Sequence, residues 1–151
     1  MTSNLFDTRF ETSLRLVVLL DEVGGDVSAD YLQAVDFMSV YGKAFSVSDA
    51  SLNGDNPFMF CELASRRELV RSSLRELVLK GYALPVASSN GFLYRPTYEG
   101  RRFAETLSDD FSSRYRQAVA AVLEGTEGAD GNELMERLTA QARESIKGLR
   151  E

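Results

Sequence analysis

One stretch, residues 64–98, constrains the fold more than any other part of the chain. Between Leu69 and Val78, leucine and valine recur at helical spacing, which predicts a helix with one apolar face. Ser65 and Glu68, three residues apart, predict a capping box at the start of this helix. Gly81 fits the left-handed position that commonly ends a helix. The stretch therefore begins with one amphipathic helix whose two ends are both marked.

The second half of the stretch predicts a β-hairpin followed by another helix. Residues 82–87 and 92–95 have strand character, and the serine, asparagine and glycine at 88–91 form a strong turn signal between them. Pro96 cannot continue a strand ladder, and Thr97 begins a new helical pattern. Helix, hairpin and helix in this order form the second half of a winged-helix domain. That fold binds DNA in some proteins and protein partners in others, so it does not settle the function.

Helical periodicity recurs through the rest of the chain. The expected helices cover residues 8–23, residues 28–38 with a break or bend near Asp36, residues 97–123 as one bent helix or two, and residues 133–149. We therefore predict a mainly α fold, namely a winged helix-turn-helix domain with one short β-hairpin wing and extra C-terminal helices.

A glycine-rich segment, residues 124–131, predicts a flexible break before the last helix, which Asn132 is placed to cap. This divides the chain into residues 1–123, a winged-helix domain that includes the following long helix, and residues 124–151, the break and the C-terminal helix. A helix with so narrow an apolar stripe is marginal alone and should dock on a partner or on the domain. The stripe gives three candidate partner-contacting residues, Leu134, Leu138 and Ile146.

A long loop, residues 42–60, supplies a second candidate partner surface. The segment is dense in glycine, asparagine, aspartate and serine, and it ends in three apolar side chains. Aromatic and methionine side chains are enriched in the cores of protein interfaces. Two interpretations stay open, packing against the core or contact with a partner, for Phe58, Met59 and Phe60.

The residue types present argue against an enzyme. The chain contains no histidine, which removes the commonest general base and the commonest metal ligand. It shows no glycine-rich phosphate loop, no cysteine cluster and no spaced acidic set that indicates a metal site. We therefore expect no catalytic residues, no bound metal, no cofactor and no small-molecule substrate.

The remaining composition indicates a cytoplasmic protein without a membrane partner. The single cysteine, Cys61, excludes an internal disulfide and fits a reducing compartment. The longest aliphatic run is far too short to cross a bilayer, and the first residues show no signal-peptide pattern.

Charge is distributed unevenly along the chain. The formal net charge is −6, yet residues 62–102 hold eight basic residues against four acidic ones. Arg67, Arg71 and Arg75 lie four apart on the predicted helix, and Arg95 lies in the wing, so these four are candidates for contact with a partner or with DNA. A solvated helix face is the alternative. Two glutamates lie beside the stripe and the wing tip has no basic residue, which favours a protein partner over phosphate contacts.

The sequence resembles the small middle components of bacterial ABC-three-component defence systems and the similar small subunit of Lamassu anti-phage systems. The resemblance spans about residues 9–123, and its clearest motifs are Arg67-Glu68-Leu69-Val70, Lys80-Gly81-Tyr82 and Tyr94-Arg95-Pro96-Thr97-Tyr98-Glu99-Gly100.

The resemblance implies a non-enzymatic accessory subunit of an anti-phage complex. Such a subunit would bridge an ABC ATPase of the structural-maintenance-of-chromosomes (SMC) or Rad50 type and an effector, often a nuclease. DNA would be sensed by the ATPase, so DNA contact is possible through the assembly. The alternative that the residues leave open is a winged-helix DNA-binding transcriptional regulator.

Overall fold

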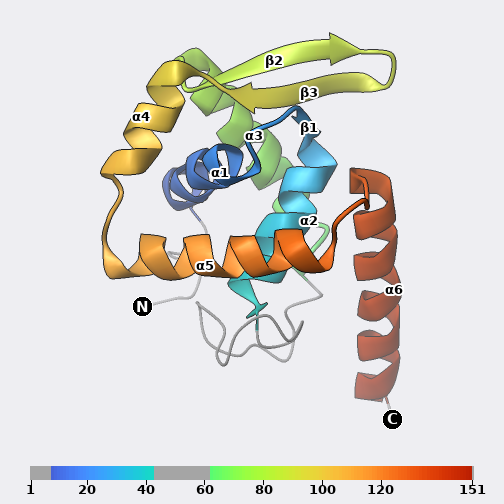
Figure 1. Ribbon diagram of the computed structural model, residues 1–151. Helices are drawn as coiled ribbons and strands as arrows, with labels where there is room; N and C mark the ends of the chain where they lie inside the picture. The colour runs from blue at the N-terminus through green and yellow to red at the C-terminus, as the bar shows by residue number, and fades with distance from the viewer. Residues whose placement is uncertain (1–7, 43–61, 151) are drawn as a thin grey trace.

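The computed structural model describes residues 8–42 and 62–150 of the 151-residue chain, and within the last helix it describes side chains as far as residue 144. The prediction of a mainly helical protein with one hairpin is confirmed (Figure 1). The elements are α1 (Arg9–Val23), β1 (Val27–Ser28), α2 (Ala29–Val40), α3 (Arg66–Leu79), β2 (Ala83–Ser88), β3 (Gly91–Pro96), α4 (Tyr98–Thr106), α5 (Asp110–Gly125) and α6 (Gly131–Arg150).

The predicted hairpin is part of a three-stranded antiparallel sheet in the order β1-β3-β2. Ser88 pairs with Gly91 across the two-residue turn Ser89-Asn90, and Gly91, the first residue of β3, has a φ of +109°, which glycine adopts without steric cost. The extra strand, β1, pairs Val27 with Tyr94. Two residues are too short a run to show strand alternation, which is why the sequence did not predict β1.

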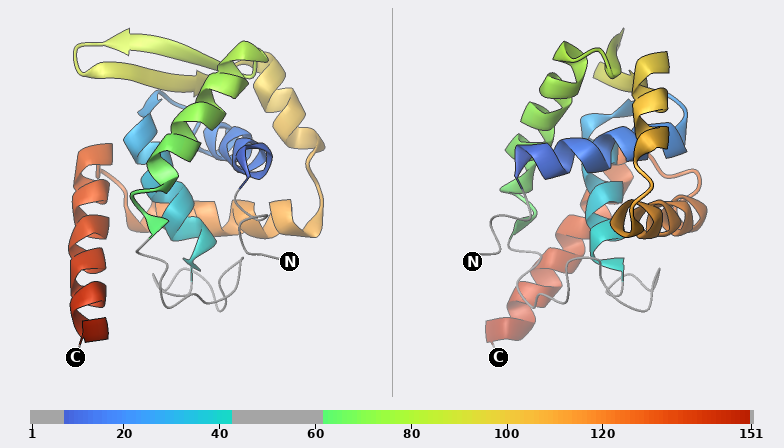
Figure 2. Two further views of the ribbon diagram at one scale, coloured as in Figure 1. Left: turned by 180° about the vertical axis from the view of Figure 1, so that it is seen from behind. Right: turned by 90° about the vertical axis from the view of Figure 1, so that its left-hand side faces the viewer.

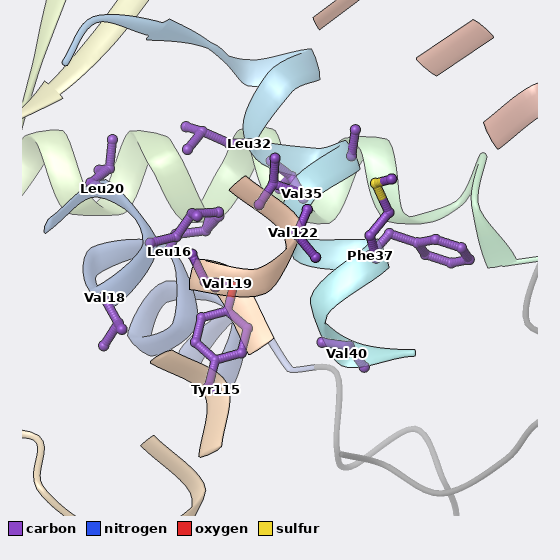
Figure 3. Close-up of a cluster of buried hydrophobic side chains, with 14 of the residues drawn as sticks. Leu16, Val18, Leu20, Leu32, Val35, Phe37, Val40, Tyr115, Val119 and Val122 are labelled. Atoms are coloured by element: carbon purple, nitrogen blue, oxygen red, sulfur yellow. The ribbon is translucent and has the colours of Figure 1, made fainter. Parts of the chain in front are cut away.

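The core forms where α1, α2, α3 and α5 meet, and Figure 3 shows its centre. Five consecutive residues of α1, Leu16–Leu20, are buried, so this helix is enclosed on all sides by the others. In α2 the apolar residues Leu32, Val35 and Phe37 are likewise fully buried. From α5, Tyr115 completes the cluster. The remaining elements are arranged around these helices.

Helix starts follow local capping chemistry at several positions. Ser28 accepts a hydrogen bond from the Tyr31 amide at 3.1 Å, as its sequence position predicts. Thr97 accepts one from the Gly100 amide at 2.9 Å. The 97–123 region resolves into two helices, α4 and α5, because Asp109 caps a new start by accepting from the Ser112 amide.

The predicted capping box at Ser65 is wrong. Ser65 already has helical backbone angles, φ −70° and ψ −24°, and its hydroxyl donates to the Glu62 carbonyl instead. A cap requires an extended backbone. The tight turn at residues 62–65 leaves no such residue at the start of α3.

The predicted cap at Asn132 is also wrong, since α6 begins at Gly131, two residues before the predicted start at residue 133, and Asp130 accepts from the Glu133 amide at 2.9 Å. Gly131 lies so close to α2 that a Cβ there would stand 2.6 Å from the Ser28 hydroxyl oxygen. This close approach, which sequence spacing does not reveal, sets the start of α6.

The expected break near Asp36 does not occur, because α2 is one uninterrupted helix and Asp36 is buried within it. The last helix packs along α2. The preceding helix, α5, continues to Gly125, two residues past the predicted domain boundary at 123.

Candidate functional site

The predicted arginine stripe lies on the exposed face of α3. Val70, Leu74 and Leu77 point into the core and hold the helix in place. Because a helix repeats every 3.6 residues, a row spaced by four on its other side faces solvent. The structure accordingly exposes Arg67, Arg71 and Arg75.

These three arginines make no ion pair and no side-chain hydrogen bond with the part of the chain that the structure describes. Glu76, which the sequence places beside the stripe, is engaged elsewhere. It contacts Arg9 at 2.9 Å and Lys80 at 3.3 Å. The positive charge of the stripe is therefore left uncompensated locally, although solvent screens each exposed guanidinium group.

A groove of about 530 Å³ separates α3 from the hairpin and from the start of α2. Two of the three stripe arginines, Arg71 and Arg75, line it, whereas Arg67 lies outside it. The opposite wall is apolar. It is formed by Pro85, Phe92 and Tyr94. The three arginines, which are equivalent in sequence spacing, therefore differ in the structure, because two line the groove and one does not.

Strand register explains the apolar wall. Pro85 pairs with Tyr94, and Ala87 pairs with Phe92, so Tyr94 and Phe92 lie two residues apart on one face of the hairpin. That face looks toward α3. Phe92 is 61% exposed.

The groove continues past Phe92 into a second hollow of about 410 Å³, which Ser28, Asp30 and Asn90 also line. Figures 1 and 2 show the hairpin extending across one end of the molecule, with its turn above the start of α6. The second hollow ends there, at Asp130. The combined groove therefore has Arg71 and Arg75 beside α3, Asp26 and Asp130 toward α6, and Asp30 in the lining of both hollows.

Arg95 does not line the groove. Its guanidinium makes a two-pronged ion pair with Asp26, with N–O distances of 2.8 and 2.9 Å. This pair ties β3 to the segment before β1. The predicted contact residue in the wing is thus engaged within the chain.

The other predicted contact residues are placed as follows. Leu134 and Leu138 are fully buried against the rest of the chain, so neither is exposed to a partner in this arrangement. The side chain of Ile146 lies outside the described residues, as do Phe58–Phe60. Partner contact by these six residues stays a prediction.

Sequence reasoning missed a buried ionic cluster that joins four helices. Asp36 of α2 accepts from Arg15 of α1 at 2.9 and 3.2 Å and from the Tyr115 hydroxyl of α5 at 2.6 Å. Arg66 of α3 lies 3.7 Å from the same carboxylate. The signal available was a single carboxylate inside the apolar run 32–40.

The cluster shifts the titration of its own members. Burial alone would raise the pKa of Asp36, but the charges of Arg15 and Arg66 and the hydrogen bonds from Arg15 and Tyr115 together hold that pKa below its ordinary value. Burial raises the pKa of Tyr115 well above its ordinary value, and the charge of Asp36 adds to this effect. The cluster is therefore a buried ionic network in which Asp36 is ionised and Tyr115 is a neutral hydrogen-bond donor.

Metal ligands and membrane spans are two further features that a chain of this size could carry. Among the described side chains, those of residues 8–42 and 62–144, there is no group of three or more histidine, cysteine, aspartate or glutamate side chains that could hold a metal ion. Over the same residues, none of the helices combines the length and apolarity that crossing a bilayer requires.

A family model described as ABC-three component (ABC-3C) system Middle Component 2 matches residues 5–148. The chain belongs to this family. Middle component 2 proteins are by description one part of a system with several components, so the chain has partner components. The resemblance to ABC-three-component systems is confirmed, while the relation to Lamassu systems stays a prediction. No match was found among curated proteins or among solved structures.

Proposed function

We propose that this middle component 2 protein is a non-enzymatic adaptor in an anti-phage defence complex of the ABC-three-component or Lamassu type. It joins an SMC- or Rad50-like ABC ATPase to an effector in the cytoplasm. The observation that carries the proposal is the family match over residues 5–148. The absence of histidine from the sequence supports a role without catalysis.

The fold supports a winged-helix arrangement as the framework of this adaptor. Strand β1 lies between α1 and α2, and the hairpin follows α3 directly. The sheet order β1-β3-β2, with the hairpin lying beside α3, supports the interpretation of the hairpin as a wing. In such an arrangement α3 occupies the position of a recognition helix, and the groove lies between that helix and the wing.

The second candidate function is DNA binding by a transcriptional regulator, which the exposed row Arg67, Arg71 and Arg75 favours. Two features count against it. The turn of the wing, Ser89-Asn90, has no basic side chain, and Asp30 lines the groove beside the arginines. A carboxylate in that position repels phosphate.

The test is whether the ATPase and effector components associate only through this chain. All three components are co-expressed with an affinity tag on the ATPase, and the preparation is repeated without this chain. An adaptor predicts that the effector is retained in the first preparation and lost in the second. Equal retention in both, or a chain that binds neither component, overturns the proposal. Sequence-specific binding to a duplex from upstream of its own coding region, with no retention on either component, establishes the regulator instead.

A further inference from the structure

We infer that the groove between α3 and the hairpin binds an acidic polypeptide segment of a partner component that carries an apolar or aromatic anchor. The inference rests on the proposed function for the identity of the partner as a component of the same assembly. The side chains that line the groove indicate the chemistry of the segment.

Charge supplies the first argument. Arg71 and Arg75 both line the groove, and neither has an ion-pair partner in the described part of the chain. Two guanidinium groups one turn apart on a helix are spaced to bind carboxylates, since each presents a planar fork of donors. The occupant facing α3 is therefore acidic.

The opposite wall requires an apolar side chain. Phe92 is largely exposed, and with Pro85 and Tyr94 it forms a continuous apolar surface across the groove from the arginines. On the α3 side, Val78 also lines the groove and adds an apolar side chain beside the arginines. Interfaces concentrate their binding energy in aromatic and arginine anchors of this kind. One segment can satisfy both walls if it places carboxylates beside an aliphatic or aromatic residue.

The far end of the groove favours a polypeptide over DNA. Beyond Phe92 the lining adds Asp130 and Asp26, of which Asp26 is already paired with Arg95, while Asp30 lines both hollows. A nucleic-acid strand carries a phosphate at every nucleotide, so it would bring negative charge to this end as well. A polypeptide can be acidic at one end and neutral or basic at the other. The change in charge along the groove therefore matches a peptide segment that is acidic at one end and neutral or basic at the other.

The first test uses charge reversal with a matched control on the same helix. Arg71→Glu/Arg75→Glu should weaken binding of the purified partner components by about tenfold or more, since attractive pairs become repulsive. Arg67→Glu changes an exposed arginine outside the groove and should leave affinity within about twofold. All three side chains are exposed, and circular dichroism spectra check that each variant is folded.

Equal effects of the two charge reversals would show that the whole stripe is used rather than the groove. If that equal weakening appears in binding of a 20-base-pair duplex, with a salt dependence that flattens by roughly one unit for each phosphate no longer bound, the occupant is DNA. Unchanged affinity in the groove variant also overturns the inference.

The second test locates the occupant directly. A photo-crosslinking p-benzoyl-phenylalanine replaces Phe92 in cells that express all components, and the product is identified by mass spectrometry. We expect a crosslink to one partner segment that contains acidic residues next to an apolar one. The matched control is the same replacement at Tyr98, which is 69% exposed on α4 and does not line the groove. That position should not give the same crosslink.

The outcomes separate this inference from the proposed function. If the effector depends on this chain for retention while Phe92 gives no crosslink or one to DNA, the adaptor role stands and the groove assignment fails. If retention is independent of this chain while Phe92 still crosslinks to an acidic segment of one component, the groove assignment stands and bridging fails.

Discussion

At the scale of single residues, Asp36 neutralises charge that the core could not otherwise hold. Arg15 and Arg66 are each at least 95% buried, and the carboxylate of Asp36 is within 4 Å of both. A buried guanidinium group without a partner carries a desolvation cost of several kcal/mol. The geometry therefore makes the fold depend on this one carboxylate far more than on any surface ion pair.

We expect Asp36→Asn to lower the free energy of unfolding by about 3–5 kcal/mol, because it removes the buried carboxylate that Arg15 and Arg66 share, although Glu62 stays 3.9 Å from Arg66. The control is Asp26→Asn, which removes the exposed pair with Arg95 and should cost at most about 1 kcal/mol. Urea denaturation followed by circular dichroism measures both. Similar losses of unfolding free energy in the two variants would show that the buried cluster stabilises the fold no more than the exposed ion pair does.

The same carboxylate predicts a pH dependence. The pKa of Asp36 in the folded chain is below its ordinary value of 3.8, so its contribution to stability is complete above that value. The contribution is lost as the pH falls through the lower, folded-state pKa. The stability difference between the wild type and Asp36→Asn should therefore be constant near neutral pH and shrink below about pH 4. A difference that stays constant in acid would contradict the assignment.

At the scale of elements, a few close backbone and hydroxyl contacts join the base of the hairpin to α4. Thr97 caps α4, and its hydroxyl donates to the Gly81 carbonyl at 2.6 Å while its amide donates to the Tyr82 carbonyl at 3.2 Å. Gly100 passes so close to the Tyr82 carbonyl that no side chain fits between them. One threonine and one glycine thus fasten the base of the hairpin to the helices on either side.

Gly100→Ala should destabilise the fold by about 1–3 kcal/mol, because its Cβ overlaps backbone atoms that cannot rotate away. Gly125→Ala is the matched helical control. A Cβ at Gly125 meets nothing within 4 Å, so this change should be neutral or stabilising by up to about 1 kcal/mol. Thermal unfolding distinguishes the two. A neutral Gly100→Ala would mean that α4 can shift away from the hairpin at little cost.

Elements whose causes lie within a few residues were predictable from the sequence. The hairpin at 88–91, the end of α3 at Gly81 and the helix starts at Ser28 and Thr97 all depend on local backbone chemistry. The cap at Ser65 was wrong because the turn at residues 62–65 gives it helical backbone angles, and the cap at Asn132 was wrong because Asp130 accepts from the Glu133 amide instead. The groove also depends on packing: spacing placed the arginines on one face, but only the position of the hairpin separates Arg67 from Arg71.

At the scale of the whole molecule, α6 packs against the other helices through a narrow contact. Its Leu134 and Leu138 are fully buried, and both belong to the same apolar cluster as α1 and α2. The helix adds to the core rather than extending as a separate body. The narrow stripe seen in the sequence is sufficient because α2 offers it a complementary apolar surface.

Leu138→Ala should therefore cost about 2–5 kcal/mol, as expected for a cavity in a packed core. Leu79→Ala, at a position 81% exposed on α3, should change stability by no more than about 0.5 kcal/mol. Hydrogen exchange gives a second measurement, since Leu138→Ala should speed amide exchange in α6 first. Unchanged exchange there would show that α6 is held by other contacts.

The position of Pro85 has a consequence for solution behaviour. Among the described strands β2 forms an edge of the sheet, and an open edge invites a strand from another molecule to pair with it. Proline has no amide hydrogen, so at residue 85 the edge lacks one donor that such a strand would need. We therefore expect the side chain that lines the groove also to disfavour pairing of this edge with a strand of another molecule.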